Sequence, residues 1–273
     1  MRVALVTDSN AALPAVLAGR VLVVPLSVRV DGRELLEGID VDADALAAAL
    51  ARGATVTTAA PAPGQFVRAY AEAVAAGAER VVSVHLGADT SGTAQAAALA
   101  ARMAPLPVEV VDSASASFGT GCCVWAAAEA LDAGGDADEA AAAARAVAAR
   151  LANVVVLGGL ALAERGGRLS PQAKELGDGL PVLALEGGRM QPVGTVHDVD
   201  EAIEVIVAHV ATLASGASLR LGVGHAAVPL VADRLAAAAA RLDVPGGVER
   251  FVFGPSTMAH TGLGAFGIVF HAL

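Results

Sequence analysis

The sequence predicts an α/β protein with parallel strands and crossover helices. Short runs of β-branched residues alternate along the chain with alanine-rich stretches, which indicates strands followed by helices. Hydrophobic residues make up 55% of the 273 residues, whereas aromatic residues make up only 3%. Such a core of Ala, Val and Leu suits helices packed on parallel strands better than an aromatic-rich β-sandwich.

The expected strands are short, apolar and rich in valine. They cover residues 3–7, 21–28, 81–85, 108–111, 154–157, 219–223, 251–253 and 267–270. In a parallel α/β sheet, ligands bind beyond the carboxyl ends of the strands. The residues that follow each strand are therefore the first candidates for a binding site.

The expected helices lie between these strands. They cover residues 42–51, 64–76, 92–103, 119–131, 136–151, 198–213 and 228–242. Several begin with Ser, Thr or Asp, whose side chains can accept the free N–H groups of a first turn. Asp136 followed by Glu139 has the spacing of a capping box.

A change in composition near residue 150 predicts two domains. The helical first half ends near Leu151, after which glycine and proline become denser. We expect an N-terminal α/β domain over residues 1–150 and a C-terminal α/β domain over residues 151–273.

Charge and cysteine content exclude several classes of function. The chain has 18 basic and 28 acidic residues, a net charge of −10, which argues against binding to nucleic acid or to an anionic membrane. The adjacent Cys122 and Cys123 supply neither a disulfide framework nor a four-ligand zinc site, which favours a reducing cytoplasm. The start of the chain reaches Asp8 without the apolar stretch of a signal peptide, and Gly and Pro interrupt the uncharged segment 251–273. We expect a cytoplasmic protein without stable membrane insertion.

Two strand ends have the same polar pair. Asp8-Ser9 follows the first strand, and Asp112-Ser113 follows the strand over 108–111. Such a pair can bind a ligand or cap the next helix, and both interpretations remain open.

Further hydroxyl groups lie where helices begin. Ser91, Gly92 and Thr93 join a strand to an alanine-rich helix, where free N–H groups attract an anion without any lysine; the alternative is a plain helix cap. Thr58 precedes a proline-containing turn, interpreted either as part of a binding site or as a rigid loop.

The second half offers a basic and a histidine candidate. Arg168 follows a glycine pair, and an arginine there often simply caps a helix end or is solvated. His260, Thr261 and Gly262 precede the last strand, where the histidine either contacts a ligand head group or belongs to a turn. Too few residues follow the nearby glycines for a dinucleotide-binding loop, and nucleophile-elbow, Walker and zinc-protease motifs are absent.

Taken in order, these segments resemble the DegV family of bacterial fatty-acid-binding proteins, which includes the binding subunits of fatty acid kinase. The resemblance rests on seven segments: Thr7-Asp8-Ser9, Val24-Pro25-Leu26, residues 58–66, Ser91-Gly92-Thr93 with Gln95, Val111-Asp112-Ser113, Gly166-Gly167-Arg168, and His260-Thr261-Gly262 with Gly264. It implies a two-domain α/β fold that holds a long-chain fatty acid in an apolar tunnel between its domains.

The resemblance also implies roles for particular residues. It implies that Thr58, Ser91 and His260 bind the carboxylate of the fatty acid. The surrounding head-group region comprises Asp8, Ser9, Gly92, Thr93, Asp112, Ser113, Arg168, Thr261 and Gly262. The chain itself is not an enzyme and needs no metal or cofactor: it presents the carboxylate to an ATP-dependent kinase subunit, which makes an acyl phosphate for phospholipid metabolism.

Two positions depart from the family pattern. Ala59 replaces a serine, which removes one hydroxyl from the expected carboxylate site. Val196-His197 occurs where many members have a basic residue, a position that bears on kinase docking. Two other functions stay open: an acyl-transfer or hydrolytic enzyme that uses Ser91 and His260, and a regulatory binder of a different small ligand.

Overall fold

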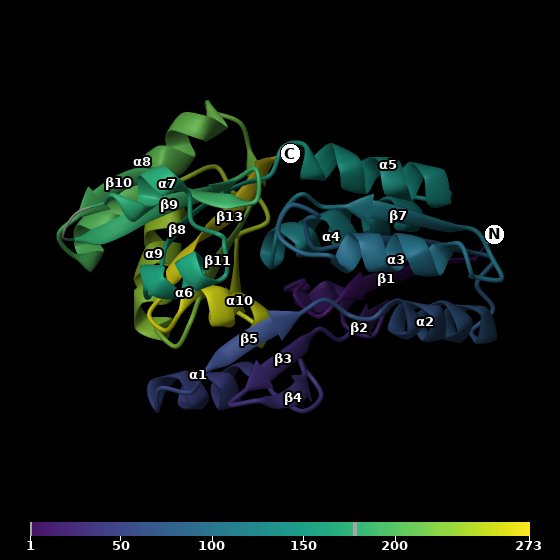
Figure 1. Cartoon of the computed structure of the whole chain (residues 1–273). Coiled ribbons are helices and arrows are strands. Elements are labelled where there is room, and N and C mark those ends of the chain that lie inside the picture. Colours follow the sequence, from purple (N-terminus) through teal and green to yellow (C-terminus); the bar gives the residue numbers. More distant parts are fainter. Residues whose placement is uncertain (1, 177–178) are drawn as a thin grey trace. The chain divides into compact units, whose positions relative to one another are not determined.

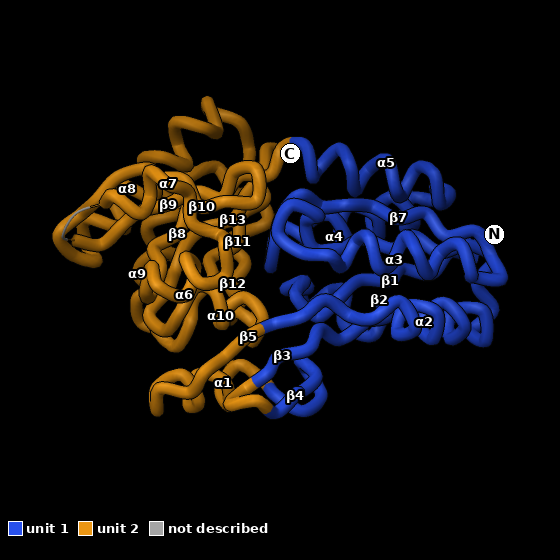
Figure 2. Tube along the Cα trace, viewed as in Figure 1, with its two compact units in different colours: residues 1–29, 33–41, 58–149 blue, residues 30–32, 42–57, 150–273 orange. Residues whose placement is uncertain are grey.

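The chain divides into two units, each with its own sheet and core. The structure, a computed structural model, describes residues 2–176 and 179–273 (Figure 1). Unit 1 comprises Met1–Arg29, Arg33–Val41 and Thr58–Ala149, and unit 2 comprises Val30–Gly32, Asp42–Thr57 and Arg150–Leu273 (Figure 2). Within the described ranges, no helix combines the length and the apolar character that crossing a bilayer requires.

A four-stranded parallel sheet forms the centre of unit 1, as expected. Its order is β2 (Val21–Val24), β1 (Val3–Asp8), β6 (Arg80–His85) and β7 (Val108–Asp112), and every neighbouring pair is parallel. Helices α2 (Pro63–Ala75) and α3 (Thr93–Ala101) bury Phe66, Tyr70 and Ala97 against this sheet. Helices α4 (Phe118–Asp132) and α5 (Ala137–Ala148) contact its strands and each other.

Local signals in the sequence explain several boundaries in this half. Asp136 caps α5 and Glu139 returns the bond to the Asp136 N–H, so the predicted capping box is confirmed. Helix α1 (Ala43–Ala51) begins after Asp42, whose carboxylate accepts the Ala45 N–H at 2.8 Å. A short 3₁₀ helix, η1 (Ala15–Leu17), precedes β2.

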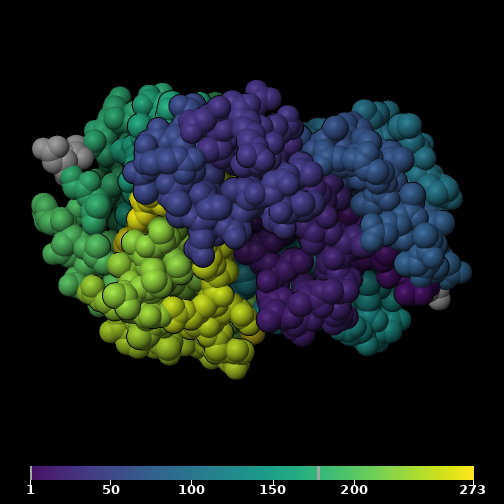
Figure 3. Space-filling model, turned by 90° about the horizontal axis from the view of Figure 1, so that it is seen from below, coloured from purple at the N-terminus to yellow at the C-terminus, as the bar shows by residue number. Residues whose placement is uncertain are grey.

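The single strand expected over residues 21–28 is wrong. The chain forms β2 and then β3 (Ser27–Val30), separated at Pro25, which has no N–H to donate to a continuous ladder. Strand β3 lies between β4 (Arg33–Leu36) and β5 (Val56–Ala59) in a three-stranded sheet. This sheet and α1 form part of the surface seen in Figure 3.

Unit 2 contains a six-stranded mixed sheet. Its order is β10 (Arg189–Val196), β9 (Leu180–Glu186), β8 (Ala152–Val156), β13 (Phe266–Ala272), β11 (Leu219–His225) and β12 (Val248–Val252). Only β11 and β12 pair in parallel; the other neighbours are antiparallel. The expectation of parallel strands is therefore wrong here. Gly187 and Gly188, both at positive φ, turn β9 back into β10 as a hairpin and make that one pair antiparallel.

Two long helices close the core of unit 2. Helix α8 (Val199–Ala214) buries Ile203 and Ile206, and α9 (Pro229–Ala239) buries Leu235, in one cluster with β8, β11 and β13. Three short helices were not expected from the sequence: α6 (Leu160–Arg165), α7 (Pro171–Lys174) and α10 (Pro255–Thr261). The segment around His260 is thus the end of a helix and not a turn.

Candidate functional site

The loop after β6 carries the first pair of candidate hydroxyls. Ser91 Oγ lies 2.8 Å from Thr93 Oγ1 and accepts the Thr93 N–H at 3.3 Å. Gly92 is the N-cap residue of α3, so neither side chain provides the usual helix cap. Thr93 is fully buried and Ser91 half-buried, which leaves Ser91 as the more accessible hydroxyl at the start of this helix.

The end of β5 lies against this loop. Along β5 the exposure alternates: Thr57 and Ala59 are exposed, whereas Thr58 and the following Ala60 are half-buried. A Cβ built on Gly92 would stand 3.9 Å from Ala60 Cβ. Ala60 directly follows β5, so the end of the segment that carries Thr58 lies beside the Ser91 loop within unit 1.

Both residues of the Asp-Ser pair after β1 form hydrogen bonds within the protein. Ser9 Oγ donates to Glu37 Oε2 at 2.6 Å and accepts the Leu26 N–H at 2.9 Å. Asp8 is fully buried and accepts the Asn10 N–H at 3.1 Å. These bonds join the end of β1 to the segment after β2, and neither side chain caps a helix.

The second Asp-Ser pair braces neighbouring loops in the same way. Asp112 Oδ1 accepts the Ala88 N–H at 3.1 Å and the Ala114 N–H at 2.8 Å. The buried Ser113 hydroxyl lies 3.0 Å from the hydroxyl of Thr120. Asp112 therefore holds the loop that leads from β6 toward Ser91.

His260 belongs to a separate cluster in unit 2. A Cβ built on Gly166, the residue that ends α6, would stand only 2.5 Å from His260 Nδ1. The guanidinium of Arg168 donates to the Gly166 carbonyl. Burial, aided by the positive charge of Arg168, lowers the pKa of His260 to about 4. The imidazole is therefore neutral at physiological pH and has one N–H to donate.

The two residues after His260, Thr261 and Gly262, stabilise the local structure. Thr261 Oγ1 donates to the Thr257 carbonyl at 3.1 Å, and the Thr261 carbonyl accepts the Gly158 N–H at 2.8 Å. Gly262 ends α10 with a φ of +78°, a conformation that favours glycine. Burial lowers the pKa of Arg168. Thr58 and Ser91 lie in unit 1, whereas Arg168 and His260 lie in unit 2.

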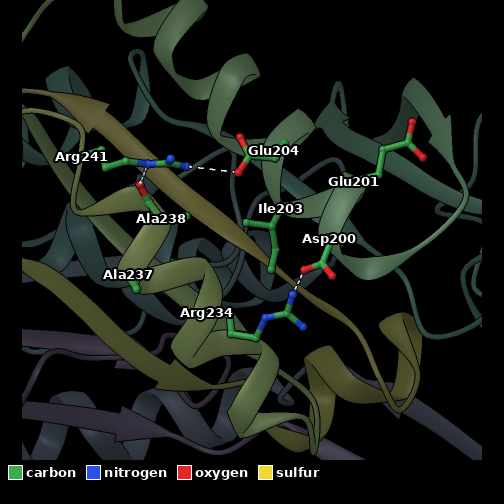
Figure 4. Close-up of a pocket in the computed structure, with 8 residues that line it drawn as sticks. All are labelled: Asp200, Glu201, Ile203, Glu204, Arg234, Ala237, Ala238 and Arg241. Atoms are coloured by element: carbon green, nitrogen blue, oxygen red, sulfur yellow. Dashed lines mark hydrogen bonds and ion pairs between the residues drawn. The ribbon is translucent and has the colours of Figure 1, made fainter.

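A groove between α8 and α9 includes none of these residues in its lining (Figure 4). Ion pairs join Arg234 to Asp200 and Arg241 to Glu204 across it. Its lining combines these charged side chains with Glu201, Ile203, Ala237 and Ala238. Among residues 2–176 and 179–273, no group of three His, Cys, Asp or Glu side chains has an arrangement that could hold a metal ion.

One polar residue near the Ser91 loop was not among the residues predicted from the sequence. His85 ends β6, is fully buried and contacts the Asp8 carboxylate at 3.0 Å. Its signal in the sequence was Ser83, two residues earlier and therefore on the same face of an otherwise apolar strand.

The similarity of this chain to known proteins extends over its whole length. A sequence model described as an uncharacterised protein of the DegV family matches residues 2–273. The chain belongs to the DegV family. Its resemblance in seven short segments is thereby confirmed. A DegV domain-containing protein from Streptomyces coelicolor is 41% identical over 276 residues, covering 98% of this chain and 97% of the relative.

Solved structures share the fold of this DegV protein. A fatty-acid-binding DegV family protein from Thermus thermophilus has 31% sequence identity and a TM-score of 0.92, with 100% of both chains covered. The fatty-acid-binding protein DegV from Bacillus subtilis has 25% identity and a TM-score of 0.86, again with 100% of both chains covered. The predicted α/β class, with a parallel-sheet domain and a second sheet domain, is confirmed.

Proposed function

We propose that this protein binds one long-chain fatty acid and holds its carboxylate with Thr58, Ser91 and His260. The observation that carries the proposal is the half-buried Ser91 hydroxyl at the N-terminus of α3, in a loop that lies beside Ala60, two residues after Thr58. The two solved relatives named above, both fatty-acid-binding proteins, support the same ligand class.

The chemistry of these groups suits a carboxylate. The first N–H groups of a helix attract an anion, and hydroxyls donate hydrogen bonds to it without a full positive charge. A neutral His260 adds one N–H donor and carries no charge that must be desolvated. Single hydrogen bonds of this kind contribute about 1 kcal/mol each, so they orient the head group more than they set its affinity.

The acyl tail supplies most of the binding free energy. A sixteen-carbon acid has about fifteen apolar carbons, and burying each gives ~0.8 kcal/mol, or about 12 kcal/mol before ordering costs. We propose that an apolar tunnel lined by the aliphatic residues of this alanine- and valine-rich chain takes up the tail.

The protein acts as a carrier and not as the catalyst. Ser91 Oγ contacts the hydroxyl of Thr93, which is no general base, so the serine is a hydrogen-bond donor and not an activated nucleophile. The carboxylate is presented to an ATP-using kinase subunit for acyl-phosphate formation in phospholipid metabolism. Because that partner needs ATP, the reaction takes place in the cytoplasm.

The docking of that kinase involves the end of β10. Val196 is buried and anchors the strand, whereas His197 is exposed and donates its backbone N–H to Glu201 at 2.7 Å. The imidazole is thus presented at the surface position where many family members have a basic side chain. We expect His197→Arg to strengthen transfer to a fatty acid kinase subunit without changing fatty-acid affinity.

Binding of palmitate to the delipidated protein tests the proposal. We expect stoichiometric binding by isothermal titration calorimetry and an affinity lowered about fivefold or more in Ser91→Ala and Thr58→Val, from the loss of one hydrogen bond each. Thr57→Val is the matched control, because it makes the same chemical change on the exposed face of β5. Wild-type protein that binds no fatty acid of any common length would refute the proposal.

A further inference from the structure

Four buried polar side chains form a chain of hydrogen bonds inside unit 1. Asp8 Oδ2 lies 3.0 Å from His85 Nδ1, and His85 Nε2 lies 2.6 Å from Ser83 Oγ. The Ser83 hydroxyl lies 3.1 Å from the hydroxyl of Tyr70. All four residues are fully buried, so this Asp–His–Ser arrangement offers no access to a substrate.

Backbone N–H groups surround the Asp8 carboxylate beside His85. Asp8 Oδ1 accepts the Asn10 N–H at 3.1 Å, and Oδ2 accepts the Leu86 N–H at 3.0 Å. An ionised Asp8 has only acceptor oxygens, so His85 Nδ1 is then the donor in its contact with Oδ2. The ring of Phe66 packs edge-on against the imidazole of His85, with 5.0 Å between the ring centroids, and holds the imidazole in its orientation.

Asp8 thereby secures β6 at the residue where the Ser91 loop begins. It binds the side chain of His85, the last residue of β6, and the N–H of Leu86, the first residue of the loop. A buried carboxylate is costly to desolvate. Here three contacts offset that cost: those with the Asn10 N–H after β1, with His85 Nδ1 at the end of β6, and with the Leu86 N–H.

Backbone hydrogen bonds connect the start of this loop to Ser91. Gly87 donates its N–H to Ser115 at 2.8 Å, and its backbone passes so close that an added Cβ would stand 2.9 Å from the carbonyl carbon of Ala114. The Ser91 N–H donates to the Gly87 carbonyl at 3.0 Å. Leu86, Gly87 and Ser91 thus form one path from the buried carboxylate to the candidate hydroxyl.

We propose that Asp8 and His85 are positioning residues that set the Ser91 hydroxyl for the carboxylate of the ligand. The inference rests on the proposed function and adds a buried pair that touches no ligand. If it holds, damage to the Asp8–His85 contact lowers affinity for ligands with a carboxylate and spares ligands with the same tail and a neutral head.

Two substitutions of His85 separate its two contacts. In His85→Asn the amide nitrogen occupies the place of Nδ1 and keeps the donor to Asp8, whereas in His85→Gln the amide reaches the place of Nε2 and keeps the contact with Ser83. The readout is the ratio of affinities of the delipidated protein for palmitate and for hexadecanol. We expect His85→Gln and Asp8→Asn to lower this ratio about tenfold, the effect of one charge-assisted hydrogen bond, and His85→Asn to leave it within threefold.

Tyr70→Phe provides the matched control. It removes the hydroxyl at the far end of the chain and leaves the Asp8–His85 contact intact, so its ratio should equal that of the wild type. Equal loss of palmitate and hexadecanol affinity in His85→Gln and Asp8→Asn would show a merely structural pair and overturn the inference. Wild-type protein that binds neither ligand would instead refute the proposed function.

Amide hydrogen exchange gives a measurement that does not depend on ligand. At a temperature below the melting point of the least stable variant, we expect Asp8→Asn to speed exchange at Leu86 and Ser91 while the amides of β7 stay protected. Unchanged exchange at Ser91 would overturn the inference even if the variants bind less fatty acid.

Discussion

His260 Nδ1 lies so close to Gly166 that a Cβ at Gly166 would stand 2.5 Å from it. Gly166 has a φ of −75°, which any residue can adopt, so glycine is required at this position for space and not for backbone conformation. The turn after α6 and the end of α10 therefore fit together only without a side chain at residue 166. The same turn brings in Arg168, whose charge helps to keep His260 neutral.

Gly166→Ala should displace the imidazole of His260. The added methyl group must move the ring, and overpacking of this kind costs about 1–3 kcal/mol. We expect palmitate affinity to fall at least fivefold with a small drop in melting temperature, measured by calorimetry on delipidated protein. Gly159→Ala is the control, because Gly159 has an extended φ of −178° and no atom within 4 Å of an added Cβ. Equal palmitate affinities in both variants would show that His260 does not contribute to fatty-acid binding.

The depressed pKa of His260 predicts a pH-dependent stability. Its pKa is about 4 in the folded protein and ~6.5 in the unfolded chain, so the unfolded state binds more protons between these values. Stability from this group is fully present above pH ~6.5 and is lost as the pH falls toward ~4, by about 3 kcal/mol in total. Urea unfolding of delipidated wild type and His260→Gln at several pH values tests this. The difference between their free energies of unfolding should shrink or reverse toward low pH; parallel curves would contradict it.

The sequence predicted the parallel half of the fold better than the mixed half. In unit 1 the valine-rich strands β6 and β7 are each followed directly by a helix, α3 and α4, so local pattern and topology agree there. In unit 2 the strand β13 lies between β8 and β11, far from both along the chain. Such long-range pairing leaves no local signal, and the glycines at 187 and 188 were interpreted as a change of composition and not as a hairpin.

The sequence predicts candidate site residues, but not the contacts that hold them in place. Strand ends pointed to Ser91, Asp8 and Asp112, yet only the structure shows that Asp8 and Asp112 bind backbone N–H groups of the loop between β6 and Ser91. His85 was hidden because a histidine at the end of an apolar strand resembles any buried polar residue. The sequence also gave no reason to connect Gly166 with His260, since 94 residues separate them along the chain.

The two cysteines should be unreactive in the folded protein. Cys122 and Cys123 lie in α4 with no exposed surface, and burial raises the pKa of Cys123 to about 12, so almost no thiolate forms at pH 8. We expect no reaction with a disulfide-forming dye in buffer and two reactive thiols per chain in denaturant. Rapid labelling of the native protein would show that α4 opens readily.

Restoring the family serine at Ala59 should have little effect. Ala59 is exposed and points to the opposite strand face from Thr58, so a hydroxyl there lies on the other side of the strand from the Thr58 hydroxyl. The hydroxyl that Ala59 lacks would therefore lie on the face of β5 opposite Thr58. We expect palmitate affinity of Ala59→Ser to stay within twofold of the wild type, whereas Thr58→Val in the same assay loses about fivefold. A gain of fivefold or more in Ala59→Ser would mean that the carboxylate is bound from the exposed face of β5, and Thr57→Val would then become the damaging substitution.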